Sequence, residues 1–333
     1  MNVKRSTGRE HTSKIYRNLP VEKLLEIAVE KNEGMITSTG SLSVKTGRYT
    51  GRSPDDRFIV FDDLTHDKVH WGKVNKRFPT ETFDKLSKKM KTFVEGKELF
   101  IFDGCVGAEP KNRLPIRRCR DHAWQSLFAH QLFIRPSAAE LEDHEPELTV
   151  ICINDFEAIP EIDGTATNAF ILINLSRKLV LIGTSNYAGE IKKSIFSVMN
   201  FILPSKGVFP MHCSANIGKD GDTALFFGLS GTGKTSLSAD PERMLVGDDE
   251  HGWSDKGIFN FEGGCYAKVI NLTEENEPDI YNAIKPGAIL ENVVLDENGD
   301  VDFADTSITQ NTRVSYPIYH IDNIQEPSIG KNP

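Results

Sequence analysis

Apolar residues recur every three or four positions in four segments of the chain. These segments are "PVEKLLEIAVEK" (20–31), "TETFDKLSKKMKTFVEG" (80–96), "CRDHAWQSLFAHQLF" (119–133) and "GEIKKSIFSVMNFIL" (189–203). This spacing predicts helices, because it places the apolar side chains on one face of the helical turn. Pro20 begins the first segment, Gly96 ends the second and Pro204 stops the last.

Short apolar runs predict the strands of a buried sheet in the first part of the chain. They are "RFIVF" (57–61), "KELFIFDGCVG" (97–107), "ELTVICIND" (147–155), "AFILINL" (169–175) and "KLVLIGT" (178–184). The second part begins differently, with an apolar run (223–230), a short helix and the run "MLVGDD" (244–249). This order of strand, loop, helix and strand is typical of a mononucleotide-binding domain.

These patterns predict a mixed α/β fold with two domains, residues 1–205 and residues 206–333, and a boundary near Ser205–Gly207. The chain has 39 Lys and Arg against 48 Asp and Glu, a net charge of −9. General binding to nucleic acid or to an anionic membrane is therefore not expected. The five cysteines have no metal-type spacing, so we expect reduced thiols in a cytoplasmic protein.

The strongest chemical signal is a phosphate-binding loop that follows the apolar run beginning at Thr223. The segment "GLSGTGKT" (228–235) fits the pattern G-x-x-x-x-G-K-[ST] completely. In such loops backbone N–H groups surround phosphate oxygens, the lysine (here Lys234) reaches the β- and γ-phosphates, and the hydroxyl of the last residue (Thr235) binds Mg²⁺. The predicted nucleotide contacts are Gly228, Leu229, Ser230, Gly231, Thr232, Gly233, Lys234, Thr235 and Ser236.

Two acids, Asp248 and Asp249, end the next predicted strand, at the same edge of the sheet as the loop. An acid there commonly holds the magnesium ion of the nucleotide, whereas the structural alternative is an Asp that caps a helix or a turn. Asp248 follows Thr235 by only 13 residues (248 − 235). Most ATPases and GTPases of this kind have a longer helix and a later acid, so an unusual phosphate-loop enzyme is indicated.

Six motifs together resemble one family, the ATP-type phosphoenolpyruvate carboxykinases. They are "TGRSPDDRFIV", "MHCSAN", "GLSGTGKT", "GDDEHGW", "NFEGGCYAK" and "QNTRVSYPIYHIDNI", and they run in the family's order from about Thr46 onward. The resemblance implies an N-terminal carboxykinase domain, then a nucleotide domain with a phosphate loop. It also implies decarboxylation of oxaloacetate and transfer of the γ-phosphoryl group of ATP, which yields phosphoenolpyruvate and CO₂.

The resemblance also implies two divalent metals, Mg²⁺ on the nucleotide and Mn²⁺ on Lys193, His212 and Asp249. Lysine binds a metal only as the neutral amine, so we expect the pKa of Lys193 to be lowered by the neighbouring cation Lys192 and by the metal itself. Without the resemblance, "EIKK" is better interpreted as a solvated basic turn, and a lone histidine as a core residue. The implied catalytic residues are Lys192, Lys193, Ser230, Lys234, Asp248 and Arg313.

Substrate contacts are implied for Arg52, Tyr187, Lys193 and Arg313, because bidentate arginines suit carboxylates. Arg313 would also contact the nucleotide, as would His212 and Glu277. The structural alternative for Arg313 is a salt bridge at a strand end. The basic run "RLPIRRCR" (113–120) has no such counterpart, and we expect it to form a solvated or structural face.

Chains of this family continue well past "HIDNI", so we expect the second domain to be incomplete. The resemblance also implies that the full-length protein is a monomer. Two other functions are compatible with the phosphate loop. One is an inactive fragment that still binds nucleotide and metal. The other is a protein kinase that acts on a serine of a carrier protein, although it leaves "TGRSP", "YAGEIKK" and "MHCSAN" unexplained.

Overall fold

The computed structural model describes residues 14–228 and 234–333. Within them, eight strands form one mixed sheet. In spatial order these are β1 (Ile15–Arg17), β6 (Leu99–Val106), β7 (Leu114–Arg120), β8 (Leu148–Ile153), β10 (Leu179–Gly183), β9 (Phe170–Asn174), β4 (Arg57–Phe61) and β5 (Lys76–Pro79). β7, β8 and β10 are parallel, whereas β6 and β9 run antiparallel to β7 and β10. The strands predicted for the first part of the chain are all present.

The four predicted helices are confirmed as α1 (Val21–Glu30), α2 (Thr80–Phe93), α3 (Ala123–Leu132) and α6 (Gly189–Ile202). α3 begins four residues later than its pattern suggested, because Cys119 and Arg120 complete β7. In α2, Phe83, Leu86 and Met90 are buried, which is the spacing of one helical face. The shorter helices are α4 (Ala138–Glu142), α5 (Pro160–Asp163), α7 (Lys234–Ser238) and α8 (Pro278–Asn282).

The second part of the described chain contains several smaller sheets. One has the order β11 (Phe209–His212), β15 (Glu250–Ser254), β16 (Gly257–Asn260) and β22 (Ile329–Gly330). Another places β12 (Ser214–Ile217) between β13 (Thr223–Phe226) and β14 (Met244–Gly247). β13 and β14 both run antiparallel to β12, so their carboxyl ends lie at the same edge. The strands predicted on either side of the phosphate loop are therefore confirmed.

A five-stranded sheet joins segments from the two ends of the chain. Its order is β17 (Gly264–Lys268), β21 (Arg313–Pro317), β18 (Ile289–Glu291), β3 (Leu42–Val44) and β2 (Gly34–Ile36), and a hairpin of β19 (Val294–Leu295) and β20 (Val301–Asp302) follows β18 in the chain. β3 pairs in parallel with β18. This sheet crosses the domain boundary expected near residue 205, and the division of the chain there stays a prediction.

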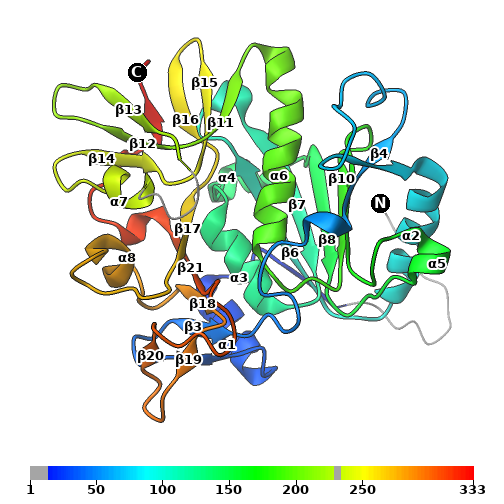
Figure 1. The fold of residues 1–333 in the computed structure, drawn as a ribbon, viewed down its shortest axis with the longest axis horizontal. Helices are drawn as coiled ribbons and strands as arrows, with labels where there is room; N and C mark the ends of the chain where they lie inside the picture. The colour runs from blue at the N-terminus through cyan, green and yellow to red at the C-terminus, as the bar shows by residue number, and fades with distance from the viewer. Residues whose placement is uncertain (1–13, 229–233) are drawn as a thin grey trace.

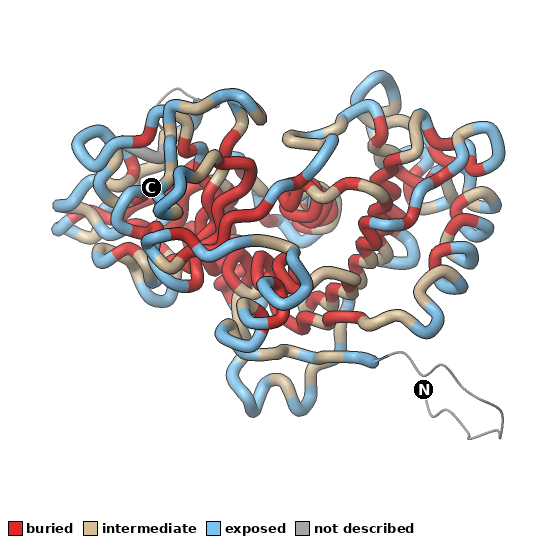
Figure 2. The backbone as a smooth tube through the Cα atoms, turned by 90° about the horizontal axis from the view of Figure 1, so that it is seen from below, coloured by how far each residue is buried: buried red, intermediate tan, exposed pale blue. Residues whose placement is uncertain are grey.

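α6 and α3 connect the two parts of the molecule. In Figure 1, α6 crosses the middle of the molecule, between strands β8 and β10 on one side and β11, β15 and β16 on the other. α3 packs against β6 and β7 and also against β17 and β21. Buried side chains of both helices belong to one apolar cluster that reaches Phe259, Phe261 and Tyr266 of the second part. Figure 2 shows such buried stretches in both halves of the molecule.

The basic run at 113–120 is not a uniformly solvated face. It forms most of β7, in which every second side chain is buried. Arg117 points outward and pairs with Asp103 at 2.7 Å, whereas Arg118 and Arg120 are each only 1% exposed. Of the two expected alternatives, a solvated or a structural face, these two arginines therefore agree with the structural one, because the pleat of the strand directs them inward.

Two further features concern the cysteines and the helices. Cys105, Cys119, Cys152, Cys213 and Cys265 are all free thiols. Across residues 14–228 and 234–333, no helix combines the length and the apolar character required to cross a membrane.

Candidate metal and nucleotide site

Three side chains that the family resemblance assigns to a metal lie together. Lys193 belongs to α6, His212 ends β11, and Asp249 lies between β14 and β15. Nε2 of His212 is 2.8 Å from Oδ1 of Asp249. Nζ of Lys193 is 2.9 Å from Oδ2 of Asp249 and 3.3 Å from Nε2 of His212. A helix, a strand and the connection between two further strands thus bring two nitrogens and a carboxylate to one point.

The register of β11 and β15 explains part of this convergence. The two strands are antiparallel, and His212 lies opposite Glu250, the residue that follows Asp249. Gly247 ends β14 close to neighbouring side chains. A Cβ atom there would lie 2.4 Å from Nδ2 of Asn260 and 2.8 Å from Nε2 of His251. A larger residue would therefore displace the backbone that leads to Asp249.

Asp249 is the electrostatic centre of the group. Besides His212 and Lys193, it pairs with Nζ of Lys192 at 3.0 Å and with Nζ of Lys234 at 3.2 Å. Burial opposes ionisation of this carboxyl, but the charge of Lys192, the hydrogen bond from His212 and the charge of Lys193 hold its pKa well below the usual range. Asp249 is therefore an anion surrounded by cations at neutral pH.

Lys192 is buried on the inner face of α6, with its ammonium group between two carboxylates. Nζ lies 2.9 Å from Oε2 of Glu262 and 3.0 Å from Oδ2 of Asp249. Burial lowers the pKa of Lys192, yet the charges of Asp249 and Glu262 outweigh burial and raise this pKa well above its ordinary value. The sequence analysis placed Lys192 in the site but did not identify Glu262 as its partner.

The lowering of the Lys193 pKa was expected from Lys192 and from the metal together. Burial lowers this pKa, and so does Lys192, as expected. Glu250, whose Oε1 lies 2.6 Å from Nζ, and Asp249 raise it more, so the net pKa shift is upward. The sequence analysis lacked Glu250, which becomes a neighbour only through the pairing of β11 and β15. A metal that binds Lys193 must therefore displace a proton.

Only part of the predicted phosphate loop lies within the described residues. Lys234 begins α7 and touches Asp249, so the loop lysine and the acid after β14 lie together as expected. Gly228 is exposed just after β13. Outside the described residues lie Leu229, Ser230, Gly231, Thr232 and Gly233, and the side chains of Thr235 and Ser236 are not described either.

Asp248 differs from Asp249 in its surroundings. Its Oδ2 accepts a hydrogen bond from the backbone N–H of Tyr266 at 3.4 Å, and burial raises its pKa. Its Oδ1 is buried and has no hydrogen-bond partner among the described residues. A buried, unpaired carboxylate oxygen is unfavourable unless a cation or a water completes it.

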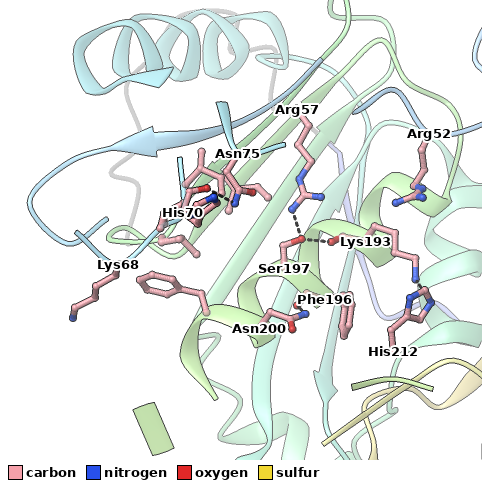
Figure 3. A pocket seen from close by; sticks show the side chains of 15 residues that line it. Arg52, Arg57, Lys68, His70, Asn75, Lys193, Phe196, Ser197, Asn200 and His212 are labelled. Atoms are coloured by element: carbon pink, nitrogen blue, oxygen red, sulfur yellow. Dashed lines mark hydrogen bonds between the residues drawn. The ribbon is translucent and has the colours of Figure 1, made fainter. Parts of the chain in front are cut away.

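The predicted substrate residues form two sets. Arg52 lines a cavity together with Lys193 and His212, and Figure 3 shows these three side chains at one end of it. Tyr187 and Arg313 instead meet at Tyr266, whose ring centroid is 6.1 Å from that of Tyr187 and 5.4 Å from the Arg313 guanidinium. Arg313 also donates from Nε to Oδ1 of Asn311 at 3.1 Å, so the salt bridge proposed as its structural alternative is replaced by an amide contact.

Tyr187 and Arg313 have two further neighbours, Tyr266 and Glu291, that the sequence analysis did not identify. Tyr266 lies in the motif "NFEGGCYAK", and its hydroxyl donates to Oε2 of Glu291 at 3.0 Å. Glu291 is fully buried, and burial raises its pKa to about 8 despite the hydrogen bond from Tyr266 and the charge of Arg313. The signal for Tyr266 was its place in a motif, whereas Glu291 had none.

Glu277 was predicted to face the base or the ribose of the nucleotide. It is half-buried and immediately precedes α8, an element separate from those that carry Lys193, His212 and Asp249. Its proposed role stays a prediction. In the described part of the chain, no three His, Cys, Asp or Glu side chains form a metal-type group by themselves.

A strand, a loop and a helix that begins with lysine, beside a strand that ends in acids, define the class of phosphate-loop nucleotide-binding proteins. Known proteins specify the family within this class. A family model described as phosphoenolpyruvate carboxykinase matches residues 13–333. The chain belongs to this family, in its ATP-type branch, as the six motifs indicated.

Individual relatives agree with this assignment. The chain is 57% identical over 327 residues to phosphoenolpyruvate carboxykinase (ATP) 2 of Moorella thermoacetica, a match that covers 98% of the chain and 62% of the relative. It is 56% identical over 329 residues to the phosphoenolpyruvate carboxykinase (ATP) of Flavobacterium johnsoniae, covering 98% of the chain and 61% of the relative. The chain thus spans about three fifths of the length of these relatives.

Proposed function

We propose that the protein is an ATP-dependent phosphoenolpyruvate carboxykinase. In this reaction the C3–C4 bond of oxaloacetate breaks, CO₂ leaves, and the enolate oxygen takes the γ-phosphoryl group of ATP, leaving ADP. The convergence of Lys193, His212 and Asp249 with the loop lysine Lys234 carries the proposal. It brings a metal-type donor set within reach of the residue that contacts nucleotide phosphates.

The residues present fit a divalent metal. The carboxylate of Asp249, which suits Mn²⁺, is held as an anion, and the nitrogens of His212 and Lys193 lie beside it as further donors. When bound, the metal would stabilise negative charge on the enolate and on the γ-phosphoryl group. Lys193, once deprotonated, would be its unusual ligand, and Lys192 would keep Asp249 oriented through their contact at 3.0 Å.

The nucleotide would lie along the phosphate loop at the start of α7. Lys234 would contact the β- and γ-phosphates, and Thr235 would hold the magnesium ion of ATP. Asp248, with its unpaired oxygen, would support that magnesium through water. Ser230 and its neighbours from Gly228 to Ser236 would supply further phosphate contacts, and His212 and Glu277 would also face the nucleotide.

Oxaloacetate would bind between the two sets of basic residues. Arg52 would hold a carboxylate, since a guanidinium forms two parallel hydrogen bonds with it. Arg313 would bridge the substrate and the γ-phosphate, with its guanidinium oriented by Tyr266 and Asn311. Tyr187 would contact the substrate or the departing CO₂. We further propose a cytoplasmic enzyme, monomeric at full length and without nucleic-acid or membrane partners, which the free cysteines and the acidic net charge support.

The test is formation of phosphoenolpyruvate from oxaloacetate and ATP with Mg²⁺ and Mn²⁺ present. We expect turnover in the natural chain and a loss of at least about a thousandfold in Lys193→Met, because an electrostatic contribution to the transition state is removed. Lys256→Met is the matched control, since this lysine is exposed in the turn between β15 and β16. Equal activity of Lys193→Met and Lys256→Met would contradict the proposal.

Binding measurements separate the carboxykinase from the inactive fragment considered above. Lys234→Ala is expected to weaken ATP binding first, whereas Lys193→Met is expected to lose the response to Mn²⁺ and keep ATP binding. A folded natural chain that binds ATP and Mn²⁺ but forms no phosphoenolpyruvate would support the inactive fragment instead.

A further inference from the structure

The cavity that contains the Lys193 end of the site continues well beyond it. Its volume is about 420 Å³. From Arg52, Lys193 and His212 it continues to a part called here its second end, which contains Arg57 next to that site and Lys68 at the far margin. Figure 3 shows Arg57 pointing into the cavity from above α6, with Lys68 at the opposite margin from His212. The Arg57 end has no part in the proposed chemistry, so its composition requires an explanation of its own.

The charge of the cavity wall is one-sided. Among the described residues that line it, there are four Lys and Arg side chains and two histidines, but no Asp or Glu. By contrast, the half-buried Arg117 on β7 is paired with a carboxylate, that of Asp103 at 2.7 Å. A basic concave surface without its own acids attracts anions.

Arg57 is the central group of this second end. It begins β4 and is largely buried, and its guanidinium donates to the hydroxyl of Ser197. Ser197 in turn donates to the backbone carbonyl of Lys193 at 2.7 Å, so its hydroxyl hydrogen is already used. In the described residues no carboxylate forms an ion pair with Arg57. Glu190 is near both Arg57 and Arg52 and offsets one of their two charges.

The wall between the two ends is apolar. Ile59 and Ile173 come from neighbouring strands of the eight-stranded sheet, Leu175 follows β9, and Phe196 and Phe201 come from α6. An inorganic anion at Arg57 would leave these side chains without a partner. A ligand with a carbon skeleton would cover them and place its charged groups at the basic ends.

We propose that the Arg57–Lys68 end of the cavity is a second anion subsite, and that it binds a small organic polycarboxylate. Arg57 would hold one carboxylate through its free N–H groups, and Lys68 would approach from the exposed margin. The carbon chain would lie on the wall of Ile59, Leu175 and Phe201. Such a ligand would lie beside Arg52. Its binding requires neither metal nor nucleotide, so it can be tested separately from the proposed carboxykinase reaction.

The experiment measures binding of tricarballylate by calorimetry, without nucleotide and with EDTA, so that neither metal nor turnover is involved. We expect saturable binding to the natural chain. Arg57→Met is expected to weaken it at least about tenfold, and Lys68→Met about threefold, since charge-assisted hydrogen bonds are lost. Lys73→Met, an exposed lysine in the loop between β4 and β5, is the control and should bind as the natural chain does.

Three further results decide the case. Arg57→Lys keeps the charge and should retain more affinity than Arg57→Met. This comparison separates a loss of binding from a folding defect. Loss of binding only in Arg52→Met would place the ligand at the substrate end and overturn the proposal. Inorganic phosphate that binds as tightly as tricarballylate would overturn the polycarboxylate assignment, because the apolar wall would then contribute nothing. Lys68→Met is exposed, so it tests the subsite even if Arg57→Met fails to fold.

Discussion

Two groups of buried basic side chains lie in this molecule, and they differ in what surrounds them. Lys192 and Lys193 on α6 contact carboxylates at distances of 2.6 to 3.0 Å. Arg118 and Arg120 on β7 are at least as deeply buried, yet most of their guanidinium nitrogens have no hydrogen-bond partner among the described residues. Burial of positive charge alone therefore does not mark a functional site here.

The difference lies in how many elements contribute opposite charge. Asp249, Glu250 and Glu262 come from the β14–β15 region and the segment after β16, and they meet the α6 lysines at the junction of two sheets. The guanidinium of Arg118 lies over the ring of Phe133 at 5.5 Å, and Arg120 donates to Oε1 of Gln125 and contacts the thiol of Cys152. An assembled network of opposite charges is expected where chemistry takes place, whereas isolated charges lower stability.

The largest effect is expected from Asp249→Asn. This change leaves Lys192, Lys193 and Lys234 without their shared carboxylate, so we expect loss of detectable phosphoenolpyruvate formation. We also expect destabilisation by about 3–5 kcal/mol, the range for breaking a buried ion pair. Urea unfolding and the coupled enzyme assay measure the two quantities. The exposed Asp255→Asn is the control, and an unchanged stability of Asp249→Asn would show that the cluster is not a network.

Lys192→Met is expected to destabilise by about 3 kcal/mol, because it leaves Glu262 buried without its cation. The double variant Lys192→Met, Glu262→Gln should recover most of this loss, since no unpaired charge remains. The interaction energy from the four unfolding curves measures the coupling. Additive effects of the two changes would contradict the pairing.

A pH dependence is expected from Glu291, which lies near the charges of both Arg313 and Arg120. Its pKa is raised from 4.5 to about 8 in the folded protein, so the folded state binds the extra proton between these values. The associated stability is complete below about pH 4.5 and is lost as the pH rises toward 8.

We expect the free energy of unfolding of the natural chain to fall by about 3 kcal/mol more than that of Glu291→Gln between pH 5 and pH 8. Urea titrations at several pH values test this difference. Parallel pH profiles of the two proteins would mean that Glu291 is ionised at neutral pH in the folded state.

The smallest and opposite effect is expected from Arg118→Met. Replacing a buried, unpaired guanidinium with an apolar side chain of similar length should raise stability by about 1–2 kcal/mol. Arg117→Met, on the outer face of the same strand, should lower it by less than about 1 kcal/mol through loss of its pair with Asp103. Destabilisation by Arg118→Met beyond that of Arg117→Met would indicate that Arg118 has a buried partner.

Much of the fold was predictable because its signals are local. Apolar spacing identified α1, α2, α3 and α6, and continuous apolar runs identified the central strands. The pairing of β3 with β18 was not predictable, since it joins segments nearly 250 residues apart by backbone hydrogen bonds. The burial of Arg118 and Arg120 was not predictable either, because charged residues occupy inward positions of β7.

The site was predictable at the level of single residues through the motifs, and much less so in its electrostatics. Lys193, His212, Asp249 and Lys234 were named and lie together. The raised pKa of Lys193 was missed because it depends on Glu250, which the register of two strands brings opposite His212. Only the folded chain contains that information.

The most direct test of the account is a titration of the natural chain with Mn²⁺, followed by the electron paramagnetic resonance signal of the free ion. The account predicts one tight site that is weakened at least about tenfold in Lys193→Met, as is usual when a metal site is damaged. ATP binding should be retained in that variant, and Lys256→Met should bind Mn²⁺ normally. Unchanged Mn²⁺ affinity in Lys193→Met would contradict the assignment of Lys193, His212 and Asp249 as the metal site.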